Sequence, residues 1–211
     1  GLHTLHVPGN RVGSLAPLVG LTNLVSLDVG RNEFGGNLMP LGRLVRLQEL
    51  SLEENGIELL GALRPLVGLK RLDLDGNRIV DLSPLAGLRA LVELDLDENA
   101  VRDVGPLAGL TNVVDLDLDN NRIQDVSPLS GMGKLTTLNL SRNQVADVSA
   151  LRSLGNLRNL RLHQNAISDL APLNALQNLT NLVISGNGIT HIVGLVGMPS
   201  LATVDLRVNQ I

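Results

Sequence analysis

The chain has 211 residues, a formal net charge of −4 and 44% apolar residues, enough to fill a continuous core. It contains no cysteine, which excludes disulfide bonds and thiolate zinc sites. No apolar run is long enough to span a bilayer, so membrane insertion of this segment is not expected, and the acidic balance disfavours nucleic acid as a partner.

An asparagine recurs along the whole sequence at an interval of 22 residues, with one extra residue between Asn32 and Asn55. A fixed period of this length is typical of one structural unit stacked many times, so we predict a single elongated domain, residues 1–211, of about ten repeats. Both ends fall inside a repeat and look uncapped, which makes end-to-end self-association an expected property. The series is Asn10, Asn32, Asn55, Asn77, Asn99, Asn121, Asn143, Asn165, Asn187 and Asn209.

The first two units contain the residues that depart from the repeating pattern. His3 and His6 lie on the predicted first strand without a third ligand, so a zinc site is not expected. Phe34, the only aromatic residue, takes a position filled elsewhere by Ile or Val and is assigned to the core. The extra residue lies beside it, in residues 35–37, where we expect a local bulge on the convex side.

The later units show the repeating frame most clearly. Leu72 and Leu74 alternate with charged residues, and this period of two predicts a short strand with one buried face. Stacked units would place such strands side by side in a parallel sheet. Asn77 follows where the chain leaves the strand, and its amide can satisfy backbone groups of the turn. Repeated in register, these amides are predicted to form an internal ladder.

The second half of each unit has leucines at intervals of three, which predicts 3₁₀ or irregular structure in preference to an α-helix. Ser83 and Pro84 open this segment, and serine can cap a helical turn while proline is tolerated directly after it. An aspartate precedes the pair and can accept hydrogen bonds from backbone amides of the turn. We assign a structural role to this group, which comprises Asp81, Asp103, Asp125, Asp147 and Asp169.

The frame L-x-x-L-x-L-x-x-N-x-L, together with DLSPLAGL and DVSPLSGM, resembles the 22-residue class of leucine-rich repeats in bacterial internalin-like surface proteins. A related short-repeat class occurs in intracellular phosphatase regulators and dynein light chains. The resemblance implies an α/β solenoid, a right-handed superhelix with a parallel β-sheet on its concave side and 3₁₀, short helical or coil segments on its convex side. It favours a bacterial cell-surface or secreted location, and a cytoplasmic one is also compatible with the sequence.

Acidic residues concentrate on the predicted concave strands of units three to six, which hold twelve of the 21 acidic residues. Like charges facing one another across strands cost stability, so their retention needs an explanation. We predict a docking surface for a basic protein partner, because an arc of one charge sign focuses potential and speeds association. A merely solvated face is the alternative. The candidate residues, called the acidic strip below, are Glu49, Glu53, Asp73, Asp75, Glu93, Asp95, Asp97, Asp115, Asp117 and Asp119.

Beyond the sixth unit the concave face becomes neutral and then mildly basic at Arg161 and His163. No aromatic residue lies on the predicted concave strands, so binding there should be electrostatic and salt-dependent. A flat strand face does not obviously surround a calcium ion with six to eight oxygens, and no metal site is predicted.

No enzymatic activity and no cofactor are predicted. Carboxylate pairs are plentiful, but no cleft is expected and no aromatic side chain is available to stack a sugar. Residues 131–134 partly match a phosphate loop, yet Leu135 stands where Ser or Thr is required. The alternatives to a binding module are a structural spacer and a targeting arm of a larger surface protein or enzyme.

Overall fold

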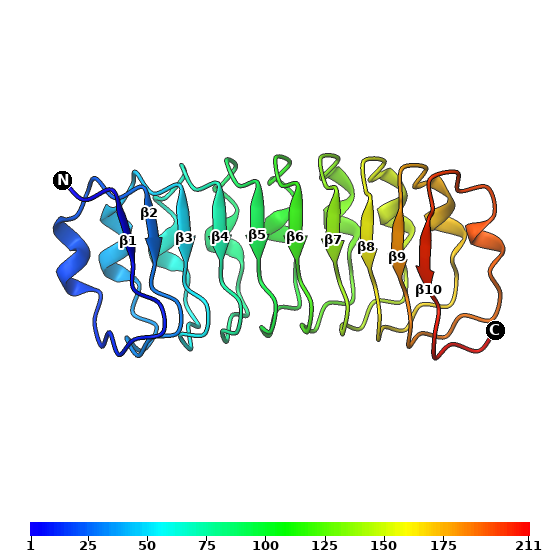
Figure 1. Ribbon diagram of the computed structural model, residues 1–211, viewed down its shortest axis with the longest axis horizontal. Helices are drawn as coiled ribbons and strands as arrows, with labels where there is room; N and C mark the ends of the chain where they lie inside the picture. The colour runs from blue at the N-terminus through cyan, green and yellow to red at the C-terminus, as the bar shows by residue number, and fades with distance from the viewer.

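The computed structural model describes all residues, 1–211, as one solenoid with its strands side by side in chain order (Figure 1). Ten short strands form a single parallel sheet in which each strand pairs with the next along the chain. The strands are β1 Thr4–His6, β2 Ser26–Asp28, β3 Glu49–Ser51, β4 Arg71–Asp73, β5 Glu93–Asp95, β6 Asp115–Asp117, β7 Thr137–Asn139, β8 Asn159–Arg161, β9 Asn181–Val183 and β10 Thr203–Asp205.

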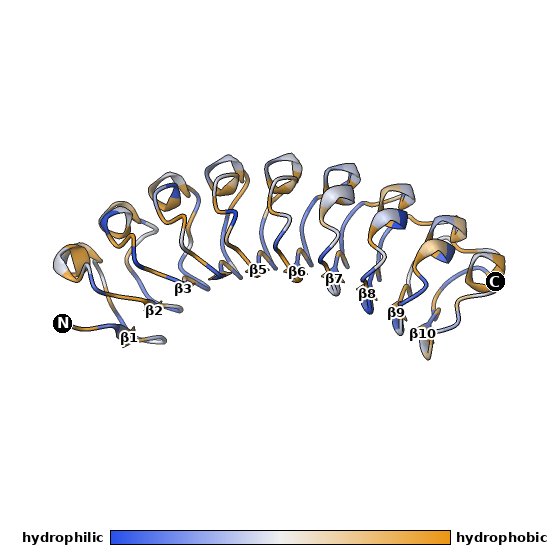
Figure 2. Ribbon diagram, turned by 90° about the horizontal axis from the view of Figure 1, so that it is seen from above, coloured by the Kyte–Doolittle hydropathy of each residue, from blue (hydrophilic) through white to orange (hydrophobic).

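Nine 3₁₀ helices alternate with the strands, and Figure 2 shows them on the outer side of the arc with the strands on the inner side. The predicted solenoid, with a parallel concave sheet and 3₁₀ segments on the convex side, is therefore confirmed. The 3₁₀ helices are η1 Ala16–Gly20, η2 Met39–Arg43, η3 Gly61–Leu63, η4 Ser83–Leu85, η5 Gly105–Leu107, η6 Ser127–Gly131, η7 Ser149–Ser153, η8 Ala171–Ala175 and η9 Val193–Leu195.

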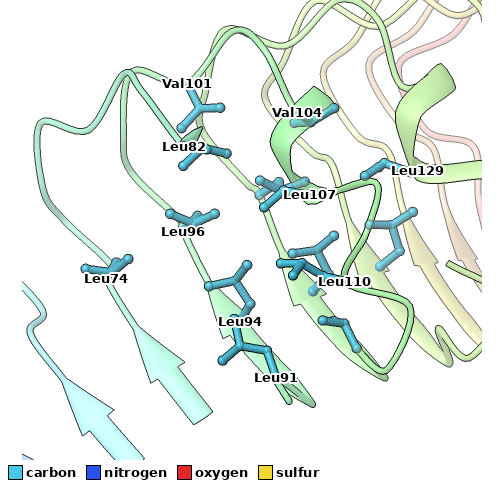
Figure 3. Packing of buried hydrophobic residues seen from close by; sticks show 14 of the residues in the cluster. Leu74, Leu82, Leu91, Leu94, Leu96, Val101, Val104, Leu107, Leu110 and Leu129 are labelled. Carbon is cyan, nitrogen blue, oxygen red and sulfur yellow. The ribbon is translucent and has the colours of Figure 1, made fainter. Parts of the chain in front are cut away.

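The core is one continuous cluster of 55 buried hydrophobic residues that runs the length of the solenoid between the two layers. Leucines of successive strands lie in register, as in the pairing of Leu72 with Leu94. Figure 3 shows Leu94, Leu107 and Leu110 filling the space between the sheet and the 3₁₀ layer. Phe34 is buried in this cluster, as predicted. Because every unit buries its leucines against its neighbours, the sheet keeps a regular register along its whole length.

The ladder asparagines bind both their own turn and the preceding unit. Asn121 Nδ2 donates to the carbonyl oxygens of Leu118 and Asp119 at 3.2 and 2.9 Å, and to that of Leu96 at 2.9 Å. Its Oδ1 accepts the Val101 N–H at 2.9 Å. The same three donations recur at each ladder position from Asn32 to Asn209, whereas Asn10 donates only within its own turn. The predicted internal ladder is confirmed.

The turns before five of the 3₁₀ helices, η4 to η8, are closed by the aspartates assigned to them. Asp81 Oδ1 accepts the Ser83 N–H at 2.8 Å, and the other four members make the equivalent bond. The predicted capping by serine is wrong, because the Ser83 hydroxyl instead donates to Asp81 Oδ2 at 2.9 Å. The carboxylate, not the hydroxyl, therefore satisfies the first free backbone amide of the turn.

The extra residue beside Phe34 is absorbed by two successive glycines. Gly35 and Gly36 have φ angles of 64° and 71°, which glycine adopts without steric cost. Asn37 then takes the place of the turn aspartate, and its Oδ1 accepts the Met39 N–H at 3.2 Å. The predicted bulge is thus confined to the connection that leads to η2, and the pairing of β2 with β3 stays in register.

A second regularity, which the sequence did not suggest, lies immediately before each ladder asparagine. The backbone there is left-handed in every unit, with φ between 49° at Glu54 and 55° at Val208 for the non-glycine residues. Gly9, Gly76 and Gly186 occupy the same position in the other units. A side chain at positive φ costs roughly 1 kcal/mol, so seven units carry local strain at this turn.

We expect Gln164→Gly to raise the free energy of unfolding by about 0.5–1 kcal/mol, measured by urea denaturation, because it relieves this strain. The Gln164 side chain makes no hydrogen bond that the change would remove; only its backbone N–H bonds, to Ser185. The matched control is Gly9→Ala, where φ is +65° and an added Cβ meets no atom within 4 Å. That variant should lose about 1 kcal/mol from backbone strain alone. A lower free energy of unfolding for Gln164→Gly would contradict the assignment of backbone strain to this position.

Candidate functional site

The structure brings all ten residues of the acidic strip onto neighbouring units of the concave face. Three columns cross the strands. The first contains Glu49, Arg71, Glu93 and Asp115, and the second contains Ser51, Asp73, Asp95, Asp117 and Asn139. The third follows two residues later in each unit, with Glu53, Asp75, Asp97, Asp119 and Ser141. Strand pairing therefore converts the linear spacing into a block of carboxylates.

The concave face is hollowed into an open groove of about 470 Å³ that extends from β1 to β6. The prediction that no cleft would form is wrong for this face, because the sheet curves and the long side chains of the first column stand beside the shorter aspartates of the second. The groove also includes His6, Ser26 and Asp28, which the sequence reasoning left out of the site. Asp28 could have been found, since it occupies the same strand position as Asp73.

Arg71 neutralises part of the first column. Its Nη1 lies 2.6 Å from Glu49 Oε1 and its Nε lies 2.9 Å from Glu93 Oε2. Both glutamates come from the adjacent strands, so Arg71 bridges three successive units. Exposed pairs of this kind contribute at most about 1 kcal/mol. Their consequence here is that the uncompensated charge of the groove lies mainly in the aspartates.

The second column has a structural role that the sequence reasoning missed. The Oδ1 atoms of Asp73, Asp95 and Asp117 accept the backbone N–H groups two residues later, at 3.1, 3.0 and 2.9 Å. Asn139 makes the same bond to the Ser141 N–H at 3.1 Å. The recurrence of Asp or Asn at this strand end was the available signal. Each of these side chains therefore closes the end of its own strand with one oxygen.

The second oxygens of this column differ from one another. Asp73 Oδ2 accepts the Ser51 hydroxyl at 3.1 Å, and Asp117 Oδ2 accepts Asn139 Nδ2 at 3.1 Å. Asp95 Oδ2 receives no hydrogen bond from a neighbouring side chain. The centre of the column thus retains a free acceptor, with a carboxylate on either side.

The third column ends in a clamped aspartate. Arg142 Nε donates to Asp119 Oδ1 at 2.8 Å and its Nη2 donates to Oδ2 at 2.5 Å, and Asp119 is only 7% exposed. A partner would therefore meet a satisfied ion pair at Asp119, not a free carboxylate. Asp75, two units earlier in the same column, has an Oδ1 atom that is shielded from solvent and accepts no hydrogen bond.

Five carboxyl groups of the acidic strip have raised pKa values. Burial, reinforced by Asp117 and Asp73, raises the pKa of Asp95 to about 7, although its bond from the Asp97 N–H acts in the opposite direction. Burial and the neighbouring Asp119 raise the pKa of Asp97 to about 6. Burial also raises the pKa values of Asp75, Asp115 and Glu53. Near neutral pH the groove therefore carries less negative charge than the formal count implies.

No group of three or more His, Cys, Asp or Glu side chains is arranged to hold a metal ion. None of the helical segments has the length and apolarity needed to cross a membrane. Arg161 and His163 lie beyond the acidic block, as the sequence indicated, and Arg161 is exposed on β8. What the groove offers chemically is a set of acceptors and negative charge.

Comparison with known proteins places the chain among repeat proteins. The family model for leucine-rich repeats matches residues 68–123, 89–145 and 111–167. No curated protein sequence matches the chain. An internalin (inlF) from Listeria monocytogenes is 32% identical, with a TM-score of 0.96, and the match covers 99% of this chain and 61% of that one. The chain thus spans less than two thirds of that structure.

Two further solved structures support the same assignment. An internalin C2 (inlC2) from Listeria monocytogenes is 38% identical, with a TM-score of 0.84, over 86% of this chain and 80% of that one. The repeat ectodomain of the Arabidopsis thaliana receptor kinase GASSHO1/SCHENGEN3 is 25% identical, with a TM-score of 0.82, over 98% of this chain and 26% of that one. It was solved in complex with Casparian strip integrity factor 2.

Proposed function

The chain belongs to the leucine-rich-repeat family, with internalin-like repeats, and on this premise we propose that it binds a basic protein partner in its acidic concave groove. Leucine-rich repeats are typically non-enzymatic scaffolds for protein interaction, and the plant receptor ectodomain was solved with its partner bound. The single observation that carries the proposal is the groove itself, a hollow of about 470 Å³ lined with carboxylates.

The charge distribution within the groove defines the proposed binding residues more narrowly than the sequence did. Asp119 is held by Arg142, and Glu49 and Glu93 are held by Arg71. Asp73, Asp95, Asp115 and Asp117 line the groove, and Asp75 and Asp97 extend the same concave surface in the third column. A basic partner would relieve the repulsion among these carboxylates, so its binding gains both from attraction and from lost self-repulsion.

A charge-neutralising variant tests the proposal. We expect Asp95→Asn, Asp97→Asn and Asp117→Asn, made together, to preserve the fold, because an asparagine oxygen can still accept the backbone N–H bonds. Binders would be selected from a displayed library of protein domains that ranges from acidic to basic. The selected domains should be basic, and their affinity for the triple variant should fall by about tenfold or more in biosensor measurements.

The matched control removes the same charge elsewhere. Asp103→Asn, Asp125→Asn and Asp147→Asn alter three exposed aspartates that also accept backbone bonds but lie at the convex turns. This control should bind the selected domains as tightly as the parent does. Raising salt from about 50 to about 150 mM should weaken the binding of the parent and of the control alike. Binders without a charge bias, or binders indifferent to the concave triple change, would reject the proposal and favour the spacer or targeting-arm alternative.

A further inference from the structure

We infer that the occupant of the groove is a basic α-helix that lies along the solenoid axis across β4, β5 and β6, a conclusion that rests on the proposed function. Three properties of the groove restrict its partner. The spacing of the carboxylates disfavours an extended chain, the hydrogen bonds between the strands exclude an added strand, and the cations at one end of the groove limit the length of the partner.

Spacing favours a helix over an extended chain. Adjacent strands lie roughly 4.8 Å apart, so Asp73 and Asp117, two strands apart, are separated by about 10 Å along the axis. A helix places a side chain on the same face once per turn, or about every 5.4 Å along its axis, so two turns span about 11 Å. An extended chain places a side chain on the same face at every second residue, or about every 6.8 Å, so two such steps span about 14 Å. The flexible stem of a lysine can accommodate the difference of about 1 Å between the helix and the carboxylates more easily than the difference of about 4 Å for the extended chain.

The pairing of the strands excludes addition of a partner strand at this place. β5 pairs with β4 on one side and β6 on the other, so its backbone groups are already engaged. A partner that reaches the groove must bind through side chains that project from a self-satisfied backbone. An α-helix meets this condition, because its own carbonyl and N–H groups bond one another.

An unpaired acceptor shows which side chains the helix must carry. Asp95 lines the groove, and only its Oδ1 is hydrogen-bonded, so its Oδ2 has no donor. The one arginine within the groove, Arg71, is committed to Glu49 and Glu93. The missing component is therefore a charged donor, an ammonium or guanidinium group, supplied from outside the chain.

Cations limit the length of the helix. Arg142 covers Asp119 at one end of the acidic block, and Arg161 follows on β8. A basic helix that continued past β6 would meet these charges. Towards the other end, the second column has Ser51 on β3 in place of a carboxylate. The favourable path therefore covers about three strands, β4 to β6, which corresponds to two or three helical turns and to one basic residue per turn.

Three synthetic peptides of identical length, composition and net charge test the inference. The first places four lysines at positions i, i+4, i+7 and i+11, the second alternates them at every second residue, and the third distributes them around the helix. Affinity would be measured by calorimetry and peptide conformation by circular dichroism. We expect the first peptide to bind about tenfold more tightly than the others and to gain helical signal on binding. The concave triple variant should lose this preference, and the convex control should keep it.

The outcomes separate this inference from the proposed function. If the alternating peptide binds most tightly, the occupant is extended and the helix is rejected, although the acidic groove still binds a basic partner. If all three peptides bind equally and all are weakened by the concave triple variant, charge alone decides and the helix is again rejected. If no peptide responds to that variant, both the helix and the basic-partner proposal are overturned.

Discussion

Replacement of Asn121 by alanine is expected to lower the free energy of unfolding by about 3–5 kcal/mol, the largest effect of any substitution considered for this chain. The side chain is 7% exposed and makes four hydrogen bonds to backbone groups. Alanine would leave the Val101 N–H without an acceptor and remove a donor from three carbonyl oxygens. Each buried group left unsatisfied costs roughly 1–3 kcal/mol.

Asn10 provides the matched control within the same series. It is exposed, and its Nδ2 donates only to the carbonyls of Val7 and Pro8 in its own turn. Asn10→Ala should therefore cost about 1 kcal/mol or less. Urea denaturation measures both losses, and hydrogen exchange at the Val101 amide should accelerate in Asn121→Ala alone. Equal losses for the two variants would show that the link to the preceding unit contributes little.

The ladder and the groove are physically connected. Asn77 and Asn99 donate to the backbone carbonyls of Asp75 and Asp97 at 3.0 and 2.9 Å. The third-column aspartates are thus held at the backbone by the amides that join the units. The rigidity of the binding face comes from the interior of the repeat, so a partner meets carboxylates whose spacing is set before binding.

The period-two and period-three patterns were sufficient to predict the sheet and the 3₁₀ layer, because each follows from burial of leucine at regular intervals. The ladder followed from the recurrence of asparagine every 22 residues. The columns of the concave face also followed, since Asp73, Asp95 and Asp117 are in register once the strands pair. These features depend on spacing alone.

Features that depend on side-chain conformation could not be predicted in the same way. The clamp between Arg142 and Asp119 requires a side chain that crosses from one unit to the preceding one, and Arg142 does so from a left-handed backbone. The groove depends on the curvature of the sheet, which no single repeat encodes. The role of Ser83 differs from expectation because its hydroxyl donates to Asp81 Oδ2 while its own N–H donates to Asp81 Oδ1, so the serine does not cap the turn.

The pH dependence of stability should report the cost of burying Asp95. Its pKa is about 7 in the folded chain against an ordinary value of 3.8, so between these values the folded state holds a proton that the unfolded state has lost. Stability must then fall as pH rises from about 4 through about 7, because the unfolded state binds fewer protons. After allowance for solvent screening, the loss assigned to Asp95 is on the order of 2 kcal/mol at pH 8.

Asp95→Asn should remove this contribution, since the amide stays neutral and its oxygen can still accept the Asp97 N–H. We expect the variant to be more stable than the parent at pH 8 and close to it at pH 5, by urea denaturation across this range. Asp147→Asn is the control, because hydrogen bonds from Ser149 lower the pKa of that exposed carboxyl and its titration lies below the window. Parallel profiles for the parent and Asp95→Asn would show that the buried carboxylate carries no such cost. Convergence of the two stability profiles at low pH would instead show that ionisation of Asp95 in the groove is made at the expense of the stability of the fold.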